Sequence, residues 1–482
     1  MAAETTPLMR QYHSVKEQVP GALLFFRMGD FYELFMDDAV IAARELEITL
    51  TSRNKDAEQP IPMAGVPYHA ADGYLARLIA KGYRVAICEQ MEAPSPGKKI
   101  VRREITRIVT PGTATDANML RSRENNYLAA VVKKANRVGL AYVDVSTGEF
   151  RSTELPLEEV GPQLESLNVR EVLAPAGVDW PGLRGRTDID AWVFDTDYST
   201  RTLREHFGLL SLDGCGLAEK PLATGAAGAV LHYLRDTQRA ALTHLDRPAF
   251  FDRNETMVLD AVTVRNLELV EPLFAGEAKE STLVHVLDET MTGMGGRLLR
   301  RRLLRPSVQR AEIEERLDAV EKLLQDTILR TGLRQVLGSI LDLERLLAKV
   351  TLGTASPREM YALGSSLGKI PALNQLLGEP RFDEVVDVRD RILTTIAEEL
   401  PLNLTDGGTI RDGISADLDQ LRDISRNSKQ YIAGIETRER GRTGISSLKV
   451  RLKSRRRTWT ACLLTMTGSR RSSTRNGSPR PS

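Results

Sequence analysis

The hydrophobic pattern of this chain changes its period near residue 266, and this change constrains the fold more than any other feature. Before it, short apolar runs typical of strands alternate with amphipathic segments, whereas from there to about residue 445 apolar residues recur every three or four positions. Alternating strands and helices predict α/β domains, and a sustained helical period predicts helices that pack along one apolar stripe. A chain of 482 residues has room for about three domains. The sequence therefore predicts a multidomain α/β plus all-α protein.

Two α/β regions precede the change. The first, which ends near residue 113, predicts helices at 9–19, 31–46 and 74–81 and strands at 23–26, 48–51 and 84–88. The second predicts strands at 128–132, 139–145 and 171–173 and a helix at 225–239. The polar turn 146–148 after the second of these strands predicts a hairpin that returns at 149–151.

The remaining region predicts long helices in a bundle or a set of levers. Ser356 is expected to cap a helix, because Pro357 suits the first turn and Glu359 can reach back to the cap amide. Another helix is predicted from Ile414 to about Arg438. Two apolar stripes lie between residues 313 and 350: Ile313, Leu317, Val320, Leu324 and Ile328, and then Val336, Ile340, Leu343, Leu347 and Val350.

The net charge of +1 conceals an uneven distribution. Residues 451–482 contain nine of the 66 lysines and arginines and no acidic residue, so the first 450 residues hold 57 basic against 65 acidic residues. A basic tail on an acidic body favours a disordered arm that binds nucleic acid non-specifically.

Secretion and membrane insertion are not expected. No apolar run approaches the roughly 18 residues of a membrane-spanning helix, and residues 1–20 lack a basic-then-apolar leader. The three cysteines lie too far apart in sequence for a disulfide framework or a zinc module. We expect a cytoplasmic protein with no membrane partner and no metal site.

Catalytic motifs are weak. The phosphate-binding pattern G-x-x-x-x-G-K-[ST] is absent, since Gly368-Lys369 is followed by Ile370. The stretch 364–368 matches the G-x-S-x-G pattern, but a helical pattern stands where a nucleophile elbow needs a strand before Ser366. We expect no catalytic and no cofactor-binding residue.

Three further features have a structural and a functional interpretation. The stretch 293–296 lacks the third glycine of a dinucleotide loop, so a tight turn is favoured. Asp144 stands where the first carboxylate of an RNase-H-like nuclease would, but metal-dependent cleavage needs several convergent carboxylates and no companion set follows, which favours a structural role. Arginines at helical spacing either contact phosphates or form a solvated face: Arg297, Arg300, Arg301, Arg302 and Arg305.

One cluster stands out. Aromatic residues make up 5% of the chain yet gather within 25–35, where a strand enters a glycine turn and returns with Phe31 near Glu33. The pattern by itself favours Phe31 as a core residue that pairs with Phe35 one helical turn later. The minority interpretation is a wedge that enters a DNA base stack.

This cluster also carries a resemblance. Residues 26–35 resemble the mismatch-reading motif of the bacterial MutS family of DNA mismatch repair proteins. Further landmarks of that family follow in the same order at 62–70, 86–90, 110–113, 236–239, 265–268 and 342–345, and the resemblance extends to about Val450. Several ordered motifs are much more specific than one, so the chain is identified as a member of this family.

The resemblance implies a domain organisation and a site. It implies a mixed α/β mismatch-binding domain at 1–115, an RNase-H-like connector without nuclease activity at 116–265 and a partial helical core and lever at 266–450, with the tail 451–482 unlike the family. It also implies that Phe31 stacks on the mispaired base and that Glu33 forms a hydrogen bond to it. The implied function is recognition of mispaired or looped double-stranded DNA in post-replicative repair.

The resemblance also implies properties of full-length members of the family that go beyond DNA recognition. They form homodimers, use ATP and magnesium in a C-terminal ATPase, and signal to a MutL-like partner in the bacterial cytoplasm, associated with the nucleoid. The family's next stretch, Gly-Tyr-Tyr, does not follow Val450, where Arg455-Arg456-Arg457 stands instead. We expect a shifted reading frame here, with a natural basic arm as the alternative, and no ATPase activity from this chain alone.

Two rival functions remain open. One is a helical scaffold whose α/β head binds protein, which predicts no preference for mismatched DNA. The other is a metal-dependent nuclease around Asp144, which predicts DNA cleavage with magnesium.

Overall fold

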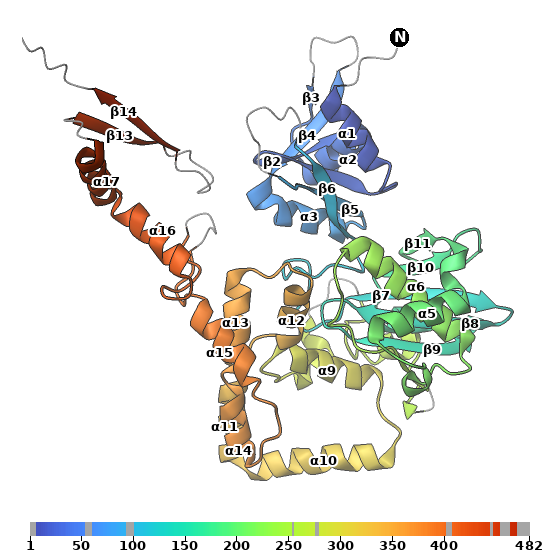
Figure 1. Ribbon diagram of the computed structural model, residues 1–482. Helices are drawn as coiled ribbons and strands as arrows, with labels where there is room; N and C mark the ends of the chain where they lie inside the picture. Colours follow the sequence, from blue (N-terminus) through green and yellow to red (C-terminus); the bar gives the residue numbers. More distant parts are fainter. Residues whose placement is uncertain are drawn as a thin grey trace, which may run out of the picture. The chain divides into compact units, whose positions relative to one another are not determined.

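The computed structural model describes residues 6–53, 60–92, 101–252, 255–274, 279–401, 407–443, 447–453 and 463–469. The chain divides into two compact units, Met1–Leu393 and Thr394–Ser482. The first unit contains two six-stranded mixed sheets followed by a run of helices (Figure 1). The predicted combination of α/β and all-α regions is therefore confirmed. None of the described helices is long and apolar enough to cross a membrane.

The first sheet has the strand order β3-β4-β2-β1-β5-β6. Strands β1 and β5 run parallel, and every other neighbouring pair is antiparallel. Its strands are β1 (Leu23–Met28), β2 (Phe31–Phe35), β3 (Thr51–Arg53), β4 (Ile61–Pro67), β5 (Val85–Gln90) and β6 (Arg103–Val109). Its helices are α1 (Pro7–Lys16), α2 (Met36–Leu46), the 3₁₀ turn η1 (Tyr68–Ala70) and α3 (Ala71–Ala80).

Both faces of this sheet are covered, because successive residues of a strand point to opposite sides. Leu24 and Phe26 of β1 pack with residues of α1 in one cluster, while Phe25 packs with residues of α2 and α3 in the other. Central strands that are buried on both faces read as continuous apolar runs, which explains the run at 23–26.

The predicted helix over 31–46 is wrong in its first part. Residues 31–35 form β2, which pairs with both β1 and β4, and α2 begins only at Met36. The predicted strand at 48–51 is displaced, since β3 starts at Thr51. Strands β4 and β6 were not predicted at all. Strand β4 contains Pro62 and Pro67, and because proline is rare inside strands its sequence indicated a loop.

The second sheet has the order β11-β10-β7-β8-β9-β12. The predicted hairpin is confirmed, because β8 and β9 pair antiparallel on either side of the turn. The strands are β7 (Tyr127–Lys134), β8 (Arg137–Asp144), β9 (Phe150–Pro156), β10 (Glu171–Pro175), β11 (Arg186–Ile189) and β12 (Ala249–Phe250). The helical elements are α4 (Leu157–Ser166), η2 (Ala191–Phe194), α5 (Thr196–Phe207), η3 (Asp213–Cys215) and α6 (Pro221–Gln238).

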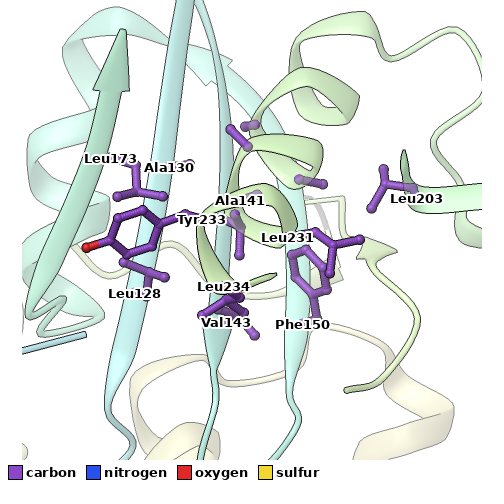
Figure 2. Close-up of a cluster of buried hydrophobic side chains, with 14 of the residues drawn as sticks. Leu128, Ala130, Ala141, Val143, Phe150, Leu173, Leu203, Leu231, Tyr233 and Leu234 are labelled. Atoms are coloured by element: carbon purple, nitrogen blue, oxygen red, sulfur yellow. The ribbon is translucent and has the colours of Figure 1, made fainter. Parts of the chain in front are cut away.

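Helix α6 covers one face of this second sheet. Leu231, Tyr233 and Leu234 of the helix meet strand residues such as Leu128 and Val143 in one buried cluster (Figure 2). The alternate residues of β7 point to the opposite face and pack in a separate cluster with residues of α4. This two-sided burial makes the second sheet the largest apolar core among the described residues.

The segment between the two sheets is held by one buried carboxylate. Glu171 of β10 accepts hydrogen bonds from the Gly112 amide at 3.1 Å, from the Thr187 hydroxyl at 2.8 Å and from the Tyr233 hydroxyl at 2.7 Å, and also from the Thr110 hydroxyl. A buried charge is tolerated when its oxygens are satisfied in this way. The stretch 110–113 therefore ties the first sheet to the second.

Helices follow from residue 261 onward. Ser356 caps α13 with Glu359 in a reciprocal capping box, as predicted. The helices are α7 (Ala261–Asn266), η5 (Lys279–Ser281), α8 (Leu283–Leu287), α9 (Gly293–Leu304), α10 (Arg310–Gln325), α11 (Thr327–Leu337), α12 (Leu343–Thr351), α13 (Pro357–Leu367), α14 (Ile370–Leu377), α15 (Val386–Thr395), α16 (Ala416–Arg426) and α17 (Ser428–Thr443).

Three predictions for this region were wrong in detail. The stretch 293–296 is the first turn of α9, capped by the Thr292 hydroxyl, and is not a tight turn. Each apolar stripe between 313 and 350 is divided between two helices, because Asp326 and Asp342 cap new helices within them. The helix predicted from Ile414 to Arg438 is interrupted at Asn427, the C-cap of α16.

The second unit contains α16, α17 and a two-stranded antiparallel sheet of β13 (Ser447–Lys453) and β14 (Leu463–Ser469). The predicted disordered tail, 451–482, therefore contributes the end of β13 and all of β14. Its other residues, 454–462 and 470–482, lie outside the described part of the chain.

Candidate nucleic-acid interface

The β1–β2 hairpin forms the tip of the first sheet. Met28 pairs with Phe31, which leaves a two-residue turn of Gly29 and Asp30. Gly29 has a φ of +60°, a conformation that glycine adopts without strain and that two-residue hairpin turns require. The carbonyl of Asp30 accepts a hydrogen bond from the Tyr68 amide at 2.9 Å, which fastens the turn to the end of β4.

Phe31 is exposed, although the sequence pattern alone favoured a buried position. Its side chain is 46% accessible, whereas Phe26 and Phe35 in the neighbouring positions of the same face are fully buried. The helical pairing of Phe31 with Phe35 is wrong because both residues belong to a strand. A phenylalanine exposed at the tip of a rigid hairpin leaves apolar area available for a ligand.

Glu33 lies on the same face of β2, two residues after Phe31. Its side chain is 22% exposed, and its Oε2 lies 3.8 Å from Nη1 of Arg53 on β3. That oxygen is inaccessible to water and accepts no hydrogen bond among the described residues. Burial raises the pKa of the Glu33 carboxyl, and Arg53 and Arg103 oppose this effect. The structure thus brings together the two residues that the sequence singled out.

A stack of side chains supports the opposite face of the hairpin. The Arg27 guanidinium lies 3.7 Å from the ring centroid of Tyr68, and its Nη1 lies 3.7 Å from Oε2 of Glu89. Glu89 also accepts a hydrogen bond from the Tyr32 hydroxyl. A stacked, paired arginine restricts motion of both strands, so the tip that carries Phe31 is held firmly.

Arg103 of β6 braces the hairpin from the other side. Its Nε donates to the carbonyl of Arg27 at 2.6 Å, and its Nη1 donates to Oε1 of Gln11 at 3.0 Å. Arg27, Arg53 and Arg103 lie around the tip together with the carboxylates of Glu89 and Glu33, and guanidinium groups are the side chains that bind the phosphates of a polyanionic ligand. Sequence reasoning singled out none of them: Arg27 lies within the aromatic cluster, but no pattern distinguished Arg53 or Arg103 from ordinary surface residues.

Asp144 is fully buried and structural, as predicted. One carboxylate oxygen accepts from the Asn125 side chain at 2.9 Å and the Asn126 amide at 3.1 Å, and the other from the amide and hydroxyl of Ser146 at 2.9 and 2.6 Å. In the described part of the chain no group of three or more His, Cys, Asp or Glu side chains could hold a metal ion. The residues around Asp144 therefore do not fit a metal-dependent nuclease.

The two motifs near residue 366 are also structural. Ser366 is buried inside α13, and its hydroxyl accepts the Leu341 amide at 3.1 Å. Gly368 ends α13 and Lys369 begins α14, both with helical backbone angles. A nucleotide would need a loop of free amides, so these residues do not fit ATP or its magnesium ion.

Most of the arginines at 297–305 contact protein groups, an arrangement that neither of the two predicted roles included. Arg297 is 4% exposed and contacts Asp342 and Glu344. Its neighbours also contact protein: Arg301 donates to Glu149 at 3.2 Å, Arg305 donates to the Tyr142 hydroxyl at 2.6 Å, and Arg300 lies 4.0 Å from Glu124. Only Arg302 of this set is exposed and without a hydrogen bond among the described residues.

Comparison with known proteins follows the same division of the chain. Family models match three consecutive stretches: MutS domain I over residues 6–118, MutS domain II over residues 126–246 and MutS domain III over residues 262–465. The hairpin that carries Phe31 and Glu33 lies within the first match.

Several relatives named DNA mismatch repair protein MutS align along the chain. That of Solibacter usitatus is 63% identical over 475 residues, which cover 94% of this chain and 55% of the relative. Those of Symbiobacterium thermophilum and Halothermothrix orenii are 43% and 41% identical, each covering 93% of this chain and 54% and 52% of the relative. The chain spans about half the length of the curated relatives it matches. On these matches, the chain belongs to the MutS family.

Proposed function

We propose that this chain recognises mispaired or looped double-stranded DNA with the hairpin tip that carries Phe31. The observation that carries the proposal is the exposure of Phe31, 46% accessible between two fully buried phenylalanines on the same sheet face. The names of the relatives, DNA mismatch repair protein, support the same ligand.

The physical basis is the deformability of DNA. An apolar wedge that enters a base step from the minor groove costs a few kcal/mol of unstacking and kinks the duplex. A mismatched base already stacks and pairs poorly, so it loses less when it is displaced. Phe31 therefore selects sites that are easy to open, without reading a particular base sequence.

Glu33 has a different part in the proposal. A carboxylate is repelled by phosphates and only accepts hydrogen bonds, whereas a protonated carboxyl can donate one to a purine N7. Burial raises the pKa of Glu33 and so favours the protonated form. Glu33 then holds the displaced base while Phe31 fills its place.

The rest of the chain supports this tip. We propose that residues 1–115 form the mismatch-binding domain, that 116–265 form an RNase-H-like connector, and that 266–450 form part of a helical core and lever. Homodimer formation, signalling to a MutL-like partner and coupling to ATP with magnesium are proposed for the full-length family in the cytoplasm, and no residue of this chain is assigned to them.

The test compares duplexes with and without one mismatch. In fluorescence anisotropy, Phe31→Ala is expected to remove the preference for the mismatched duplex, a loss of about 1–3 kcal/mol if it equals one base–aromatic stack. Weak binding to the matched duplex remains. Val40→Ala is the control, because Val40 is similarly exposed on α2. Preference that survives in Phe31→Ala overturns the proposal and favours the protein-binding scaffold.

A further inference from the structure

The unsatisfied oxygen of Glu33 calls for an explanation. Oε2 is closed to water, and no described group donates a hydrogen bond to it. Buried polar atoms without a hydrogen bond are rare, because losing contact with water costs free energy. A nearby charge of opposite sign can offset part of that cost. The nearest cation is Arg53, whose Nη1 lies 3.8 Å away, which is close enough for attraction but too far for a hydrogen bond.

Arg53 is loosely held. It lies on the edge strand β3, its side chain is 32% exposed, and its guanidinium passes 5.9 Å from the ring centroid of Phe35 to reach Glu33. Among the described residues it donates no hydrogen bond. An arginine in this position can turn toward a phosphate, which offers two parallel hydrogen bonds that Glu33 does not provide.

The second cation near Glu33 is fixed. Arg103 donates to the carbonyls of Arg27 and Val101 and to the side chain of Gln11, at 2.6 to 3.0 Å. Releasing it would break several hydrogen bonds at once. Arg53 is therefore the cation that a ligand can remove at low cost.

Two other titratable groups on this face, Cys88 and Tyr12, stay neutral near pH 7. Burial raises the pKa of the Cys88 thiol on β5 to about 12 and raises the pKa of the Tyr12 hydroxyl on α1 above its usual value. The Tyr12 hydroxyl donates to Asp38 of α2, and the charge of Asp38 is balanced by Lys16 of α1 at 2.7 Å. Arg53 and Arg103 are the charged groups that oppose the effect of burial on the pKa of Glu33, and Arg53 is the more loosely held of the two.

We propose that Arg53 is the counter-ion that keeps Glu33 ionised in the free protein and moves to a DNA phosphate on binding, so that Glu33 takes up one proton in the complex. The inference rests on the proposed function and adds a switch to it. The proton comes from solvent and converts the carboxylate to the neutral acid. The acceptor-only carboxylate becomes a donor only when a phosphate is in place.

The switch predicts a linkage between pH and binding. If Glu33 gains a proton in the complex, affinity for the mismatched duplex falls as pH rises above the point at which free Glu33 ionises. Arg53→Met removes the counter-ion, so that free Glu33 stays neutral up to a higher pH. The pH at which affinity begins to fall is therefore higher in this variant. Loss of one phosphate contact also lowers the slope of log affinity against log salt by about 0.9.

The experiment measures fluorescence anisotropy with mismatched and matched duplexes between pH 5 and 9. The variants are Arg53→Met, Glu33→Gln and the double variant, with Arg53→Lys to restore the charge. Arg77→Met is the matched control, because Arg77 is exposed on α3, against the opposite face of the sheet. The pH at which affinity begins to fall should be higher in Arg53→Met than in the natural chain, unchanged in Arg77→Met and nearly unchanged in Arg53→Lys. Neither Glu33→Gln nor the double variant should show the fall in affinity that depends on Glu33.

The two hypotheses fail differently. In one outcome, affinity begins to fall at the same pH in Arg53→Met and in the natural chain, while Phe31→Ala abolishes mismatch preference. This outcome overturns the switch and leaves the proposed function standing. No mismatch preference in the natural chain, or preference that survives Phe31→Ala, overturns the proposed function itself.

Discussion

Arg297 and Asp342 form a two-point ion pair. Nη1 of Arg297 donates to Oδ2 of Asp342 at 2.6 Å, and Nη2 donates to Oδ1 at 2.8 Å. The same guanidinium also donates to the Ser122 carbonyl at 2.9 Å and to Glu344 at 2.6 Å. A residue from helix α9 thus joins helix α12 to the segment that precedes the second sheet.

Arg297→Met is expected to destabilise the first unit by about 3 kcal/mol, since it removes the guanidinium from the Asp342 carboxylate, which keeps its capping hydrogen bond from the Arg345 amide, and from the Ser122 carbonyl. Urea unfolding followed by far-UV circular dichroism measures the loss. The exposed Arg302→Met is the control and should stay within about 0.5 kcal/mol of the natural chain. Full stability together with weaker DNA binding in Arg297→Met would instead support a phosphate contact.

Gly112→Ala is expected to destabilise the link between the two sheets by about 1–3 kcal/mol. A Cβ at this position would lie 2.9 Å from Cβ of Glu171 and 3.0 Å from Cβ of Leu128, both of which are buried. Gly73→Ala is the matched control: its Cβ meets nothing within 4 Å in α3, and it should gain up to about 1 kcal/mol of helix propensity. Thermal unfolding of the two variants should therefore shift in opposite directions.

Glu33→Gln is expected to stabilise the free protein in a pH-dependent way. Burial raises the pKa of Glu33 in the folded state above the ordinary value of 4.5. Below that value the carboxyl is neutral in both states, so the variant gains little. As pH rises through the folded-state pKa, the natural chain loses stability that the variant keeps. Urea midpoints between pH 4 and 8 measure this difference, which should widen and then level off.

Glu45 provides a control of opposite sign. Hydrogen bonds from Lys81 and then Arg44 lower its pKa to about 2, so its contribution is present above pH 4.5 and lost toward pH 2. Glu45→Gln should therefore lose a small amount of stability at pH 7, since its partners Lys81 and Arg44 are exposed and solvent screens these ion pairs. A gain for Glu45→Gln, or a loss for Glu33→Gln at neutral pH, would contradict this assignment.

The strand–turn–strand pattern around Ser146 was predictable, because polar turn residues between β-rich runs determine a hairpin locally. The capping box at Ser356 and Glu359 was predictable for the same reason, since its partners are three residues apart. The stretch 31–35 was not, because apolar spacing in a short segment fits a strand or a helix equally well. Its pairing with β1 and β4 decided the outcome.

The sequence by itself determined the division into α/β and helical regions and the local turns and caps, and its resemblance to a known family implied the pair Phe31 and Glu33. These depend on residue spacing along the chain and on motifs that lie within a few residues of each other. Tertiary structure decided that Phe31 is exposed, that Arg53 reaches Glu33 and that most of the arginines at 297–305 contact protein groups. Those properties depend on which distant strands and helices meet, because burial and charge pairing are set by neighbours that sequence spacing does not reveal.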